Sequence, residues 1–161
     1  MGRLSHLDDA GRARMVDVGD KAPSRRRAVA RGEVRFNAAA YDALRSNRLA
    51  KGDALAVARL AGLQAAKRTS EWIPLCHALA LDHLAVEIEL RDDARCAVVQ
   101  AAAAAHGRTG VEMEALVAVS AACLALYDMA KALDRGIVIG EIRLLSKEGG
   151  RSGSWSAPLD T

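Results

Sequence analysis

Residues 84–90 read Leu-Ala-Val-Glu-Ile-Glu-Leu, an alternation that places large apolar side chains on one face and two glutamates on the other. A period of two predicts a strand with one buried face and one exposed face. A second strand-like run follows at about residues 96–104, and Asp92-Asp93 between the two runs is typical of a hairpin turn. The two runs therefore predict an antiparallel hairpin, and the elements on either side of it decide the fold.

Helical patterns flank this hairpin. Before it, the sequence predicts a short helix at about residues 38–48 and a second helix at about residues 54–67. Asp53 can cap the second helix, and Pro74 should prevent this helix from continuing into the next turn. After it comes the longest predicted helix, at about residues 111–133, which is apolar around nearly its whole circumference. A helix of this kind is buried on more than one side.

Two further strand patterns, at about residues 25–36 and 137–145, complete the order β-α-β-β-α-β. This order predicts an α+β ferredoxin-like sandwich, to which the short helix is an addition. We expect residues 1–24 to form an N-terminal arm, residues 25–148 a single domain, and the glycine- and serine-rich residues 149–161 a mobile tail.

Composition narrows the class of protein. A chain of 161 residues fits one domain, and with 51% hydrophobic but only 3% aromatic residues its core must be built mainly from Ala, Leu, Val and Ile. Three cysteines without CxxC spacing argue against a disulfide framework and a structural zinc site, so we expect a reducing cytoplasm. No signal peptide and no long uninterrupted apolar run is visible, which predicts a protein that is neither secreted nor membrane-spanning.

The net charge of +3 is unevenly distributed, because five arginines crowd one predicted strand. They are Arg25, Arg26, Arg27, Arg31 and Arg35. Such a cluster is compatible with an anionic partner, and equally with a solvated edge strand that its charges protect from aggregation. Composition alone leaves both interpretations open.

Asp128 and Lys131 stand three residues apart on the long predicted helix and are therefore neighbours on its surface. On an exposed helix this would be an ordinary ion pair of little energetic consequence. The flanking residues are apolar, so we expect the pair to be partly buried, which makes a catalytic role as plausible as a structural one.

Glu112 and Glu114 lie at the start of the same helix. Glu112 follows Thr109 at the spacing of a capping box, which would explain it structurally. Glu114 has no such duty, and near a helix N-terminus its carboxylate could accept two hydrogen bonds from the edge of guanine. Glu114 and Asp128 are fourteen residues apart, or about 21 Å along a helix, so a small ligand that touches both requires two subunits.

His77 follows Cys76 in a predicted turn. Adjacent side chains on a turn usually point apart, which makes a cysteine nucleophile activated by this histidine a weak hypothesis. A proton donor or ligand contact suits His77 better, since imidazole titrates near neutral pH, although a hydrogen-bonded structural histidine fits the sequence equally well. No residues show metal-ligand spacing.

Several cations stand at the predicted ends of elements: Lys51, Lys67, Arg68 and Lys147. Each alone is compatible with a solvated charge. Together with Arg26 they could form a phosphate-binding rim, because we expect these helix and strand ends to converge at one end of the sandwich. No glycine-rich phosphate loop is present, so a nucleotide would be held by side-chain cations.

Six strings occur in order along the chain. They are MVDV at 15–18, KGD at 51–53, GLQAAKRT at 62–69, IPLCH at 73–77, TGVEMEAL at 109–116 and YDMAK at 127–131. Together they strongly resemble the MoaC family, the cyclic pyranopterin monophosphate synthases of molybdenum cofactor biosynthesis, over about residues 4–153. Ala78 and Ala130 depart from the proline and cysteine common in that family, which affects only local turn rigidity.

The resemblance implies a lyase that converts 3′,8-cyclo-7,8-dihydro-GTP into cyclic pyranopterin monophosphate with release of pyrophosphate. It implies a homohexamer, built as a trimer of dimers with sites at the dimer interface, and residues 25–148 as the catalytic domain. No cofactor is required, although Mg²⁺ could accompany the pyrophosphate, and neither nucleic acid nor membrane is a partner.

By the same resemblance, the residues that carry the chemistry are Asp128 as acid or base with Lys51, His77 and Lys131. Those that contact the substrate are Leu75, Cys76, His77, Glu112, Met113 and Glu114, with Arg26, Lys67, Arg68 and Lys147 on the triphosphate. One rival function is an RNA-binding module, which the scarcity of aromatic residues disfavours. Another is an inactive relative that only assembles with partners, which the intact catalytic residues disfavour.

Overall fold

The strands form one antiparallel sheet in the computed structural model, which describes residues 10–151 and 153–158. Its spatial order is β2-β3-β1-β4-β5, and every neighbouring pair is antiparallel. The strands are β1 (Ser24–Arg35), β2 (His83–Arg91), β3 (Cys96–Gly107), β4 (Val138–Glu148) and β5 (Trp155–Ser156). The helices are α1 (Ala38–Arg45), α2 (Ala54–Ala66), α3 (Thr69–Trp72) and α4 (Glu112–Ala130).

The predicted ferredoxin-like α+β fold is confirmed. Strands β1 to β4 with helices α2 and α4 give the order β-α-β-β-α-β, and α1 is the additional short helix. The alternating run forms β2, whose hairpin partner β3 extends to Gly107. The sequence did not predict α3 or β5. Strand β5 lies in the segment that was expected to be a mobile tail, and it pairs with the end of β4.

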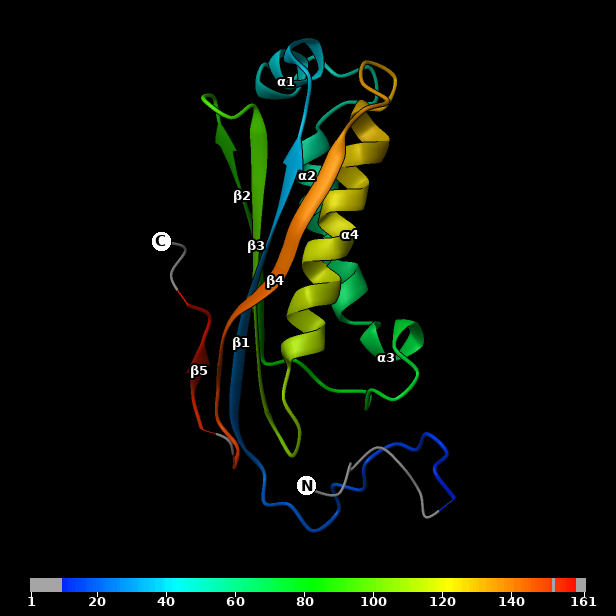
Figure 1. Ribbon diagram of the computed structural model, residues 1–161, viewed down its shortest axis with the longest axis vertical. Coiled ribbons are helices and arrows are strands. Elements are labelled where there is room, and N and C mark those ends of the chain that lie inside the picture. The colour runs from blue at the N-terminus through cyan, green and yellow to red at the C-terminus, as the bar shows by residue number, and fades with distance from the viewer. Residues whose placement is uncertain (1–9, 152, 159–161) are drawn as a thin grey trace.

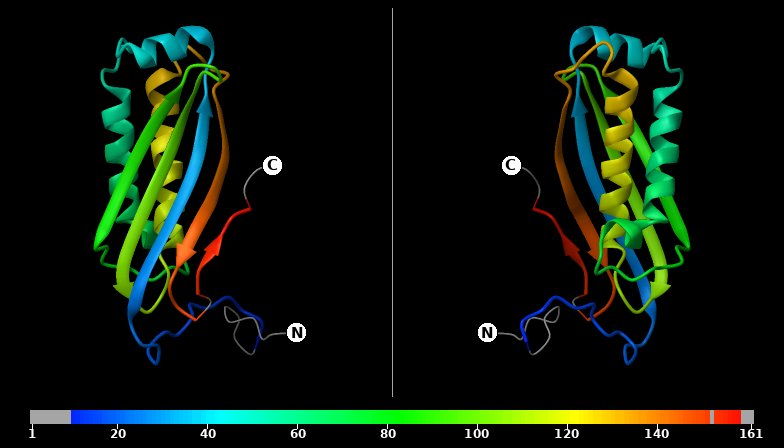
Figure 2. Two further views of the ribbon diagram at one scale, coloured as in Figure 1. Left: turned by 90° about the vertical axis from the view of Figure 1, so that its left-hand side faces the viewer. Right: turned by 90° about the vertical axis from the view of Figure 1, so that its right-hand side faces the viewer.

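Helices α2 and α4 cover one face of the sheet and lie side by side on it (Figures 1 and 2). Small residues allow this close approach, as the composition predicted. A Cβ atom on Gly32 of β1 would lie 2.7 Å from Cγ1 of Val119 on α4. A Cβ atom on Gly62 of α2 would lie 2.8 Å from the carbonyl oxygen of Ala118 on α4. Both glycines therefore set the distance between α4 and its neighbours.

Helix α4 is long and apolar enough to span a membrane by length and composition, but 61% of its apolar window is buried within the fold. Eleven of its residues are buried, including Leu126 and Val119, which are fully enclosed. The helix therefore behaves as the core helix of the sandwich. Its two ends emerge at opposite ends of the sheet, as Figure 1 shows.

The arginines of β1 are divided between the two faces of the sheet, because side chains alternate along a strand. Arg26 lies on the helix side in register with the core residues Ala28 and Ala30. Arg31, on the face without helices, forms ion pairs with Glu33 and Glu141. The five arginines therefore do not form one surface that could bind an anion. One of them lies on the helix side of the sheet, and the others lie on the open face, where some form ion pairs with glutamates.

Candidate active site

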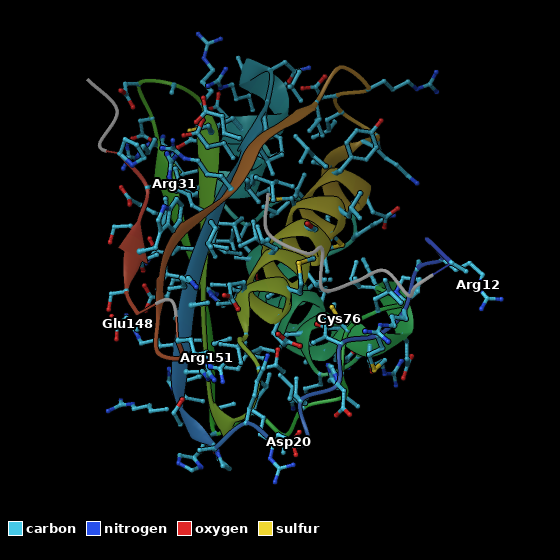
Figure 3. All side chains as sticks on the ribbon, turned by 60° about the horizontal axis from the view of Figure 1, so that its bottom comes forward. Arg12, Asp20, Arg31, Cys76, Glu148 and Arg151 are labelled. Carbon is cyan, nitrogen blue, oxygen red and sulfur yellow. The ribbon has the colours of Figure 1, made fainter. Side chains whose placement is uncertain are left out.

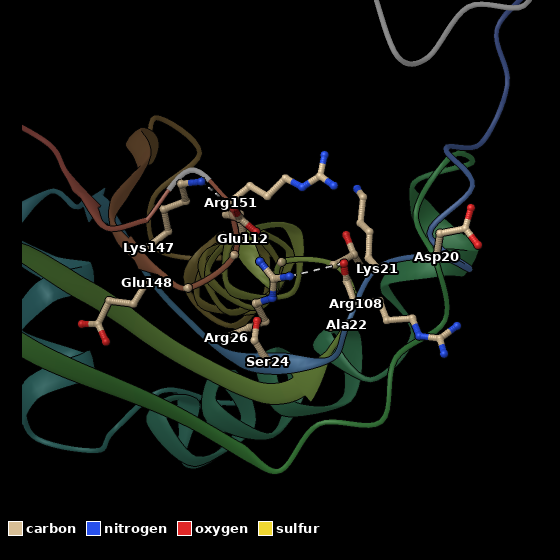
Figure 4. Close-up of a pocket in the computed structure, with 14 residues that line it drawn as sticks. Asp20, Lys21, Ala22, Ser24, Arg26, Arg108, Glu112, Lys147, Glu148 and Arg151 are labelled. Atoms are coloured by element: carbon tan, nitrogen blue, oxygen red, sulfur yellow. Dashed lines mark hydrogen bonds and ion pairs between the residues drawn. The ribbon is translucent and has the colours of Figure 1, made fainter.

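A hollow of about 680 Å³ lies where β1 begins, β4 ends and α4 begins (Figure 4). We call it the cation hollow, because five cationic side chains line it: Lys21, Arg26, Arg108, Lys147 and Arg151. Of the acidic residues on its wall, Glu148 is exposed and pairs with Arg27 at 3.8 Å. An excess of cations around an open hollow favours a multiply charged anion such as a polyphosphate.

A second hollow of about 410 Å³ adjoins the first. We call it the Glu114 hollow; its wall is formed by the loop and helix residues Leu75, Cys76, His77, Leu79, Met113 and Glu114 and by Val16 and Val18 of the arm. The two hollows share Lys21, Thr109, Gly110 and Glu112. In Figure 3, Cys76 lies on the helix side of this end of the molecule and Arg151 lies beside β1 and β4. One extended ligand could therefore occupy both hollows.

Glu114 is a carboxyl group with almost no access to water. Glu114 is 4% exposed, and this burial raises the pKa of its carboxyl group. The nearby Glu112 raises the pKa further, whereas a hydrogen bond to the Glu114 backbone lowers it. A ligand that donates hydrogen bonds to this carboxyl group would stabilise the charge that burial disfavours. The position at the start of α4 confirms the predicted placement near a helix N-terminus.

The predicted capping box at the start of α4 is wrong. The helix begins at Glu112, its N-cap is Val111, and no side chain caps it. Thr109 lies too far before the helix to serve. The Glu112 carboxylate instead lies against Gly110, so closely that a Cβ atom on Gly110 would overlap it. Oε1 of Glu112 lies 3.9 Å from Nζ of Lys147. Glu112 thus stands on the wall that the two hollows share.

At the other end of α4, Asp128 lies between two lysines. Lys51 Nζ donates to Asp128 Oδ2 at 2.6 Å and to its backbone carbonyl at 3.0 Å, and Lys131 Nζ lies 2.8 Å from Oδ1. The hydrogen bonds from Lys131 and then Lys51 lower the pKa of Asp128 to about 2, and Asp128 raises that of Lys131. The turn of Gly52, at φ +91°, and the Asp53 cap of α2 present Lys51 to α4.

The expected burial of the Asp128–Lys131 pair is wrong for the single chain. The side chains of Lys51, Asp128 and Lys131 are 46%, 53% and 52% exposed. Asp128 and Lys131 lie at the C-terminal end of α4, where Lys51 of the loop before α2 contacts Asp128 without covering it. We call these three residues the lysine–aspartate cluster. Its groups are charged, hydrogen-bonded and open to an approaching ligand.

The predicted convergence of all the cations at one end is also wrong. Lys51 belongs to the lysine–aspartate cluster, whereas Arg26 and Lys147 line the cation hollow at the opposite end of α4. Lys67 and Arg68 join α2 to α3 and line neither hollow. Within one chain the candidate site therefore consists of two halves, about 21 Å apart along the helix axis.

Cys76 and His77, which the family resemblance assigns to substrate contacts, line the Glu114 hollow. Burial, reinforced by Glu114, raises the pKa of the Cys76 thiol. A thiol that resists ionisation is a poor nucleophile, which agrees with the weak case for cysteine catalysis. Among the described residues, no three His, Cys, Asp or Glu side chains gather into a metal site.

Three cations of the cation hollow were not among the residues predicted from the sequence: Lys21, Arg108 and Arg151. Lys21 ends the arm, Arg108 follows β3, and Arg151 follows a glycine pair after β4. All three lie next to glycine-containing turns that border predicted strands. Cations at the ends of neighbouring antiparallel strands were the pattern that could have indicated them.

The fold and the hollows define an α+β protein of the ferredoxin-like class with a cation-lined hollow beside a hollow that holds a buried carboxyl group. The model of the MoaC family matches residues 15–150. Three relatives named cyclic pyranopterin monophosphate synthase are similar to the chain over nearly the full length of both. The relative from Novosphingobium aromaticivorans is 54% identical over 98% of this chain and 99% of its own length. The relative from Chloroflexus aurantiacus is 53% identical over 96% of this chain and 95% of its own length. The relative from Thermomicrobium roseum is 52% identical over 96% of this chain and 93% of its own length. The chain belongs to the MoaC family.

Proposed function

We propose that the chain is a cyclic pyranopterin monophosphate synthase of molybdenum cofactor biosynthesis, which acts on 3′,8-cyclo-7,8-dihydro-GTP and releases pyrophosphate. One observation carries the proposal: a cation-lined hollow adjoins a hollow with a buried carboxyl group, in a chain more than half identical to relatives of that name. A triphosphate joined to a guanine-derived base requires this combination of sites.

Substrate binding divides between the two hollows. The triphosphate would lie among Arg26, Lys147 and the other cations of the cation hollow, where guanidinium and ammonium groups form charge-assisted hydrogen bonds. The amino and imino groups of the base would donate to Glu114, with Cys76 and His77 beside it. Such contacts offset the cost of the buried Glu114 charge, so they favour this base over one without two adjacent donors.

The chemistry falls to the lysine–aspartate cluster and His77. Rebuilding the purine-derived rings into a pterin requires successive proton transfers, which positioned acids and bases supply. In the free protein Asp128 is held ionised by both lysines. A phosphate group that draws Lys51 or Lys131 away would raise the pKa of Asp128 and make it a better base.

Closing the cyclic phosphate needs cations at the α-phosphate. A ribose hydroxyl oxygen attacks the α-phosphorus and passes its proton to Asp128 as general base, while the bond from the α-phosphorus to the bridging oxygen breaks and pyrophosphate leaves with the electron pair. The ammonium groups of Lys51 and Lys131 would stabilise the charge that develops. Mg²⁺, where it takes part, would be held by pyrophosphate oxygens, since no acidic cluster that could hold it gathers among residues 10–151 and 153–158.

We propose that two subunits complete each site. The lysine–aspartate cluster and the hollows lie at opposite ends of α4, too far apart for one substrate. In a symmetric dimer the cluster of one subunit would face the hollows of its partner, which gives two equivalent sites. The exposure of the cluster in the single chain supports this arrangement. The homohexamer that the family resemblance implies and the cytoplasmic location that the cysteine content predicts belong to the same proposal.

Incubation of the purified protein with the cyclised dihydro-GTP tests the proposed activity. We expect a pterin product and one equivalent of pyrophosphate, detected by chromatography and by a coupled phosphate assay. Loss of both products in the Asp128→Asn protein would tie them to this chain. If a MoaC-family synthase of established activity turns over in the same mixture and this chain does not, the proposed activity is wrong.

A further inference from the structure

After β4 the chain turns through Gly149 and Gly150 directly over Arg26. Both glycines have left-handed backbone conformations, with φ of +95° and +77°. A Cβ atom on Gly149 would overlap the backbone carbonyl oxygen of Arg25. A Cβ atom on Gly150 would overlap Nη1 of Arg26. Gly150 therefore lies in contact with the guanidinium group itself.

Arg26 is held from the other side by the loop after β3. Its Nε donates to the carbonyl oxygen of Gly107 at 3.3 Å, and its Nη2 donates to that of Arg108 at 3.4 Å. The guanidinium plane thus lies between two loops. Figure 4 shows it within the cation hollow, with Lys147 on its left, Lys21 on its right and Arg151 above it.

We propose that Gly150 is a positioning residue for the cation hollow: the absence of its side chain allows the Arg26 guanidinium to lie where the triphosphate binds. This inference rests on the proposed function, which places the triphosphate in this hollow. An arginine recognises phosphate through the fixed geometry of its planar fork, so a displaced guanidinium loses more than a displaced ammonium group would.

The chain supplies a matched control in Gly153. Its φ of +62° is also left-handed, but among residues 10–151 and 153–158 no atom beyond its chain neighbours lies within 4 Å of the position that a Cβ atom would occupy. Gly150→Ala and Gly153→Ala therefore share the backbone strain, and only Gly150→Ala displaces Arg26. Because the displaced atom is the end of a flexible side chain, the fold should accommodate Gly150→Ala.

The test is binding of inorganic tripolyphosphate to the full-length protein, measured by calorimetry, together with KM and kcat for the cyclised dihydro-GTP. We expect Gly150→Ala to weaken tripolyphosphate binding by at least about tenfold, as for the loss of a hydrogen bond to a charged group, and Gly153→Ala by less than about twofold. KM should rise by a similar factor in Gly150→Ala while kcat stays unchanged.

Two further variants separate positioning from a structural role. Asparagine tolerates the left-handed region but carries a Cβ atom, so Gly150→Asn should bind as weakly as Gly150→Ala if displacement of Arg26 is the cause. In an Arg26→Ala background, Gly150→Ala should have no further effect, because its target is absent.

The inference is overturned if Gly150→Ala and Gly153→Ala bind equally well, if Gly150→Asn restores binding, or if the effects of Gly150→Ala and Arg26→Ala multiply. A different result marks failure of the proposed function. If Arg26→Ala alone binds tripolyphosphate as the parent does, the triphosphate does not lie at Arg26, and both the placement of the substrate and this inference are wrong.

Discussion

The Nζ atom of Lys51 lies 2.6 Å from Oδ2 of Asp128, although the two residues are 77 positions apart in the chain. This contact joins the loop before α2 to the last turn of α4. With Lys131 on the other carboxylate oxygen, it holds two ammonium groups beside one carboxylate at the surface of the subunit. Exposed ion pairs contribute little to the stability of a fold, so a role in the proposed reaction explains the cluster better than a contribution to stability does.

Asp128→Asn should lower kcat by about 10²–10⁴, the usual contribution of a positioned acid or base. The amide keeps the shape of the carboxylate but no longer ionises, so both lysines lose their counter-charge. The melting temperature should stay within about 2 °C of the parent, because the group is exposed. Steady-state assay and calorimetry measure the two effects.

Asp93→Asn, in the exposed turn between β2 and β3, is the matched control and should change neither quantity. A drop in melting temperature without loss of turnover in Asp128→Asn would show that Asp128 is structural.

Glu114→Gln should stabilise the protein at pH 8 and have little effect at pH 4. Folding raises the pKa of Glu114 above its unfolded value of about 4.3. The folded state therefore loses stability as the pH rises from the unfolded pKa through the folded pKa, and loses none below the unfolded pKa. Glutamine imitates the protonated carboxyl group and removes this loss. Thermal unfolding across the pH range is the measurement, and a stability difference that does not change with pH would refute the explanation.

Gly32→Ala should destabilise the fold by about 1–3 kcal/mol, as overpacking of a core does. The added methyl group would press against Val119 of α4 and Ile142 of β4. Gly140→Ala, in β4 opposite Glu33 of β1, is the control, because among the described residues no atom beyond its chain neighbours lies within 4 Å of the added Cβ atom. Urea unfolding of both variants is the measurement; equal unfolding midpoints would show that Gly32 does not set the distance between α4 and the sheet.

Lys147→Ala should raise KM for the cyclised dihydro-GTP by about tenfold, because a charged contact with the triphosphate is lost. The dependence of KM on salt should weaken at the same time, since one fewer cation attracts the substrate. Arg35→Ala removes a cation of the open face, whose partners Glu33 and Glu141 line neither hollow, and should leave KM unchanged. A rise in KM of equal size in both variants would mean that net charge, and not the cation hollow, binds the substrate.

The sequence predicted those elements that a local pattern defines. The alternation at 84–90 indicated β2, and the length of the largely apolar stretch at about residues 111–133 indicated α4. Helix α3 is a single turn of four residues and leaves no periodic pattern, and β5 forms through pairing with β4. Neither is visible in local sequence.

For the site, residue type and spacing identified the two ends of α4 but not their surroundings. The distance between Glu114 and Asp128 follows from the rise of a helix, which is fixed. The exposure of Asp128 and the separation of Lys51 from Lys147 depend on the path of the chain between elements. The same holds for Lys21, Arg108 and Arg151, which only the tertiary fold brings together.

The central claim is that one subunit supplies the hollows and its partner the lysine–aspartate cluster. Co-expression of Glu114→Gln subunits with Asp128→Asn subunits tests it most directly, with each variant alone as the inactive control. Random pairing should restore about one quarter of the sites of the parent protein, because half of the dimers are mixed and each mixed dimer has one intact site. Mixed oligomers, isolated with two different affinity tags, that remain as inactive as the separate variants would show that each site lies within a single chain.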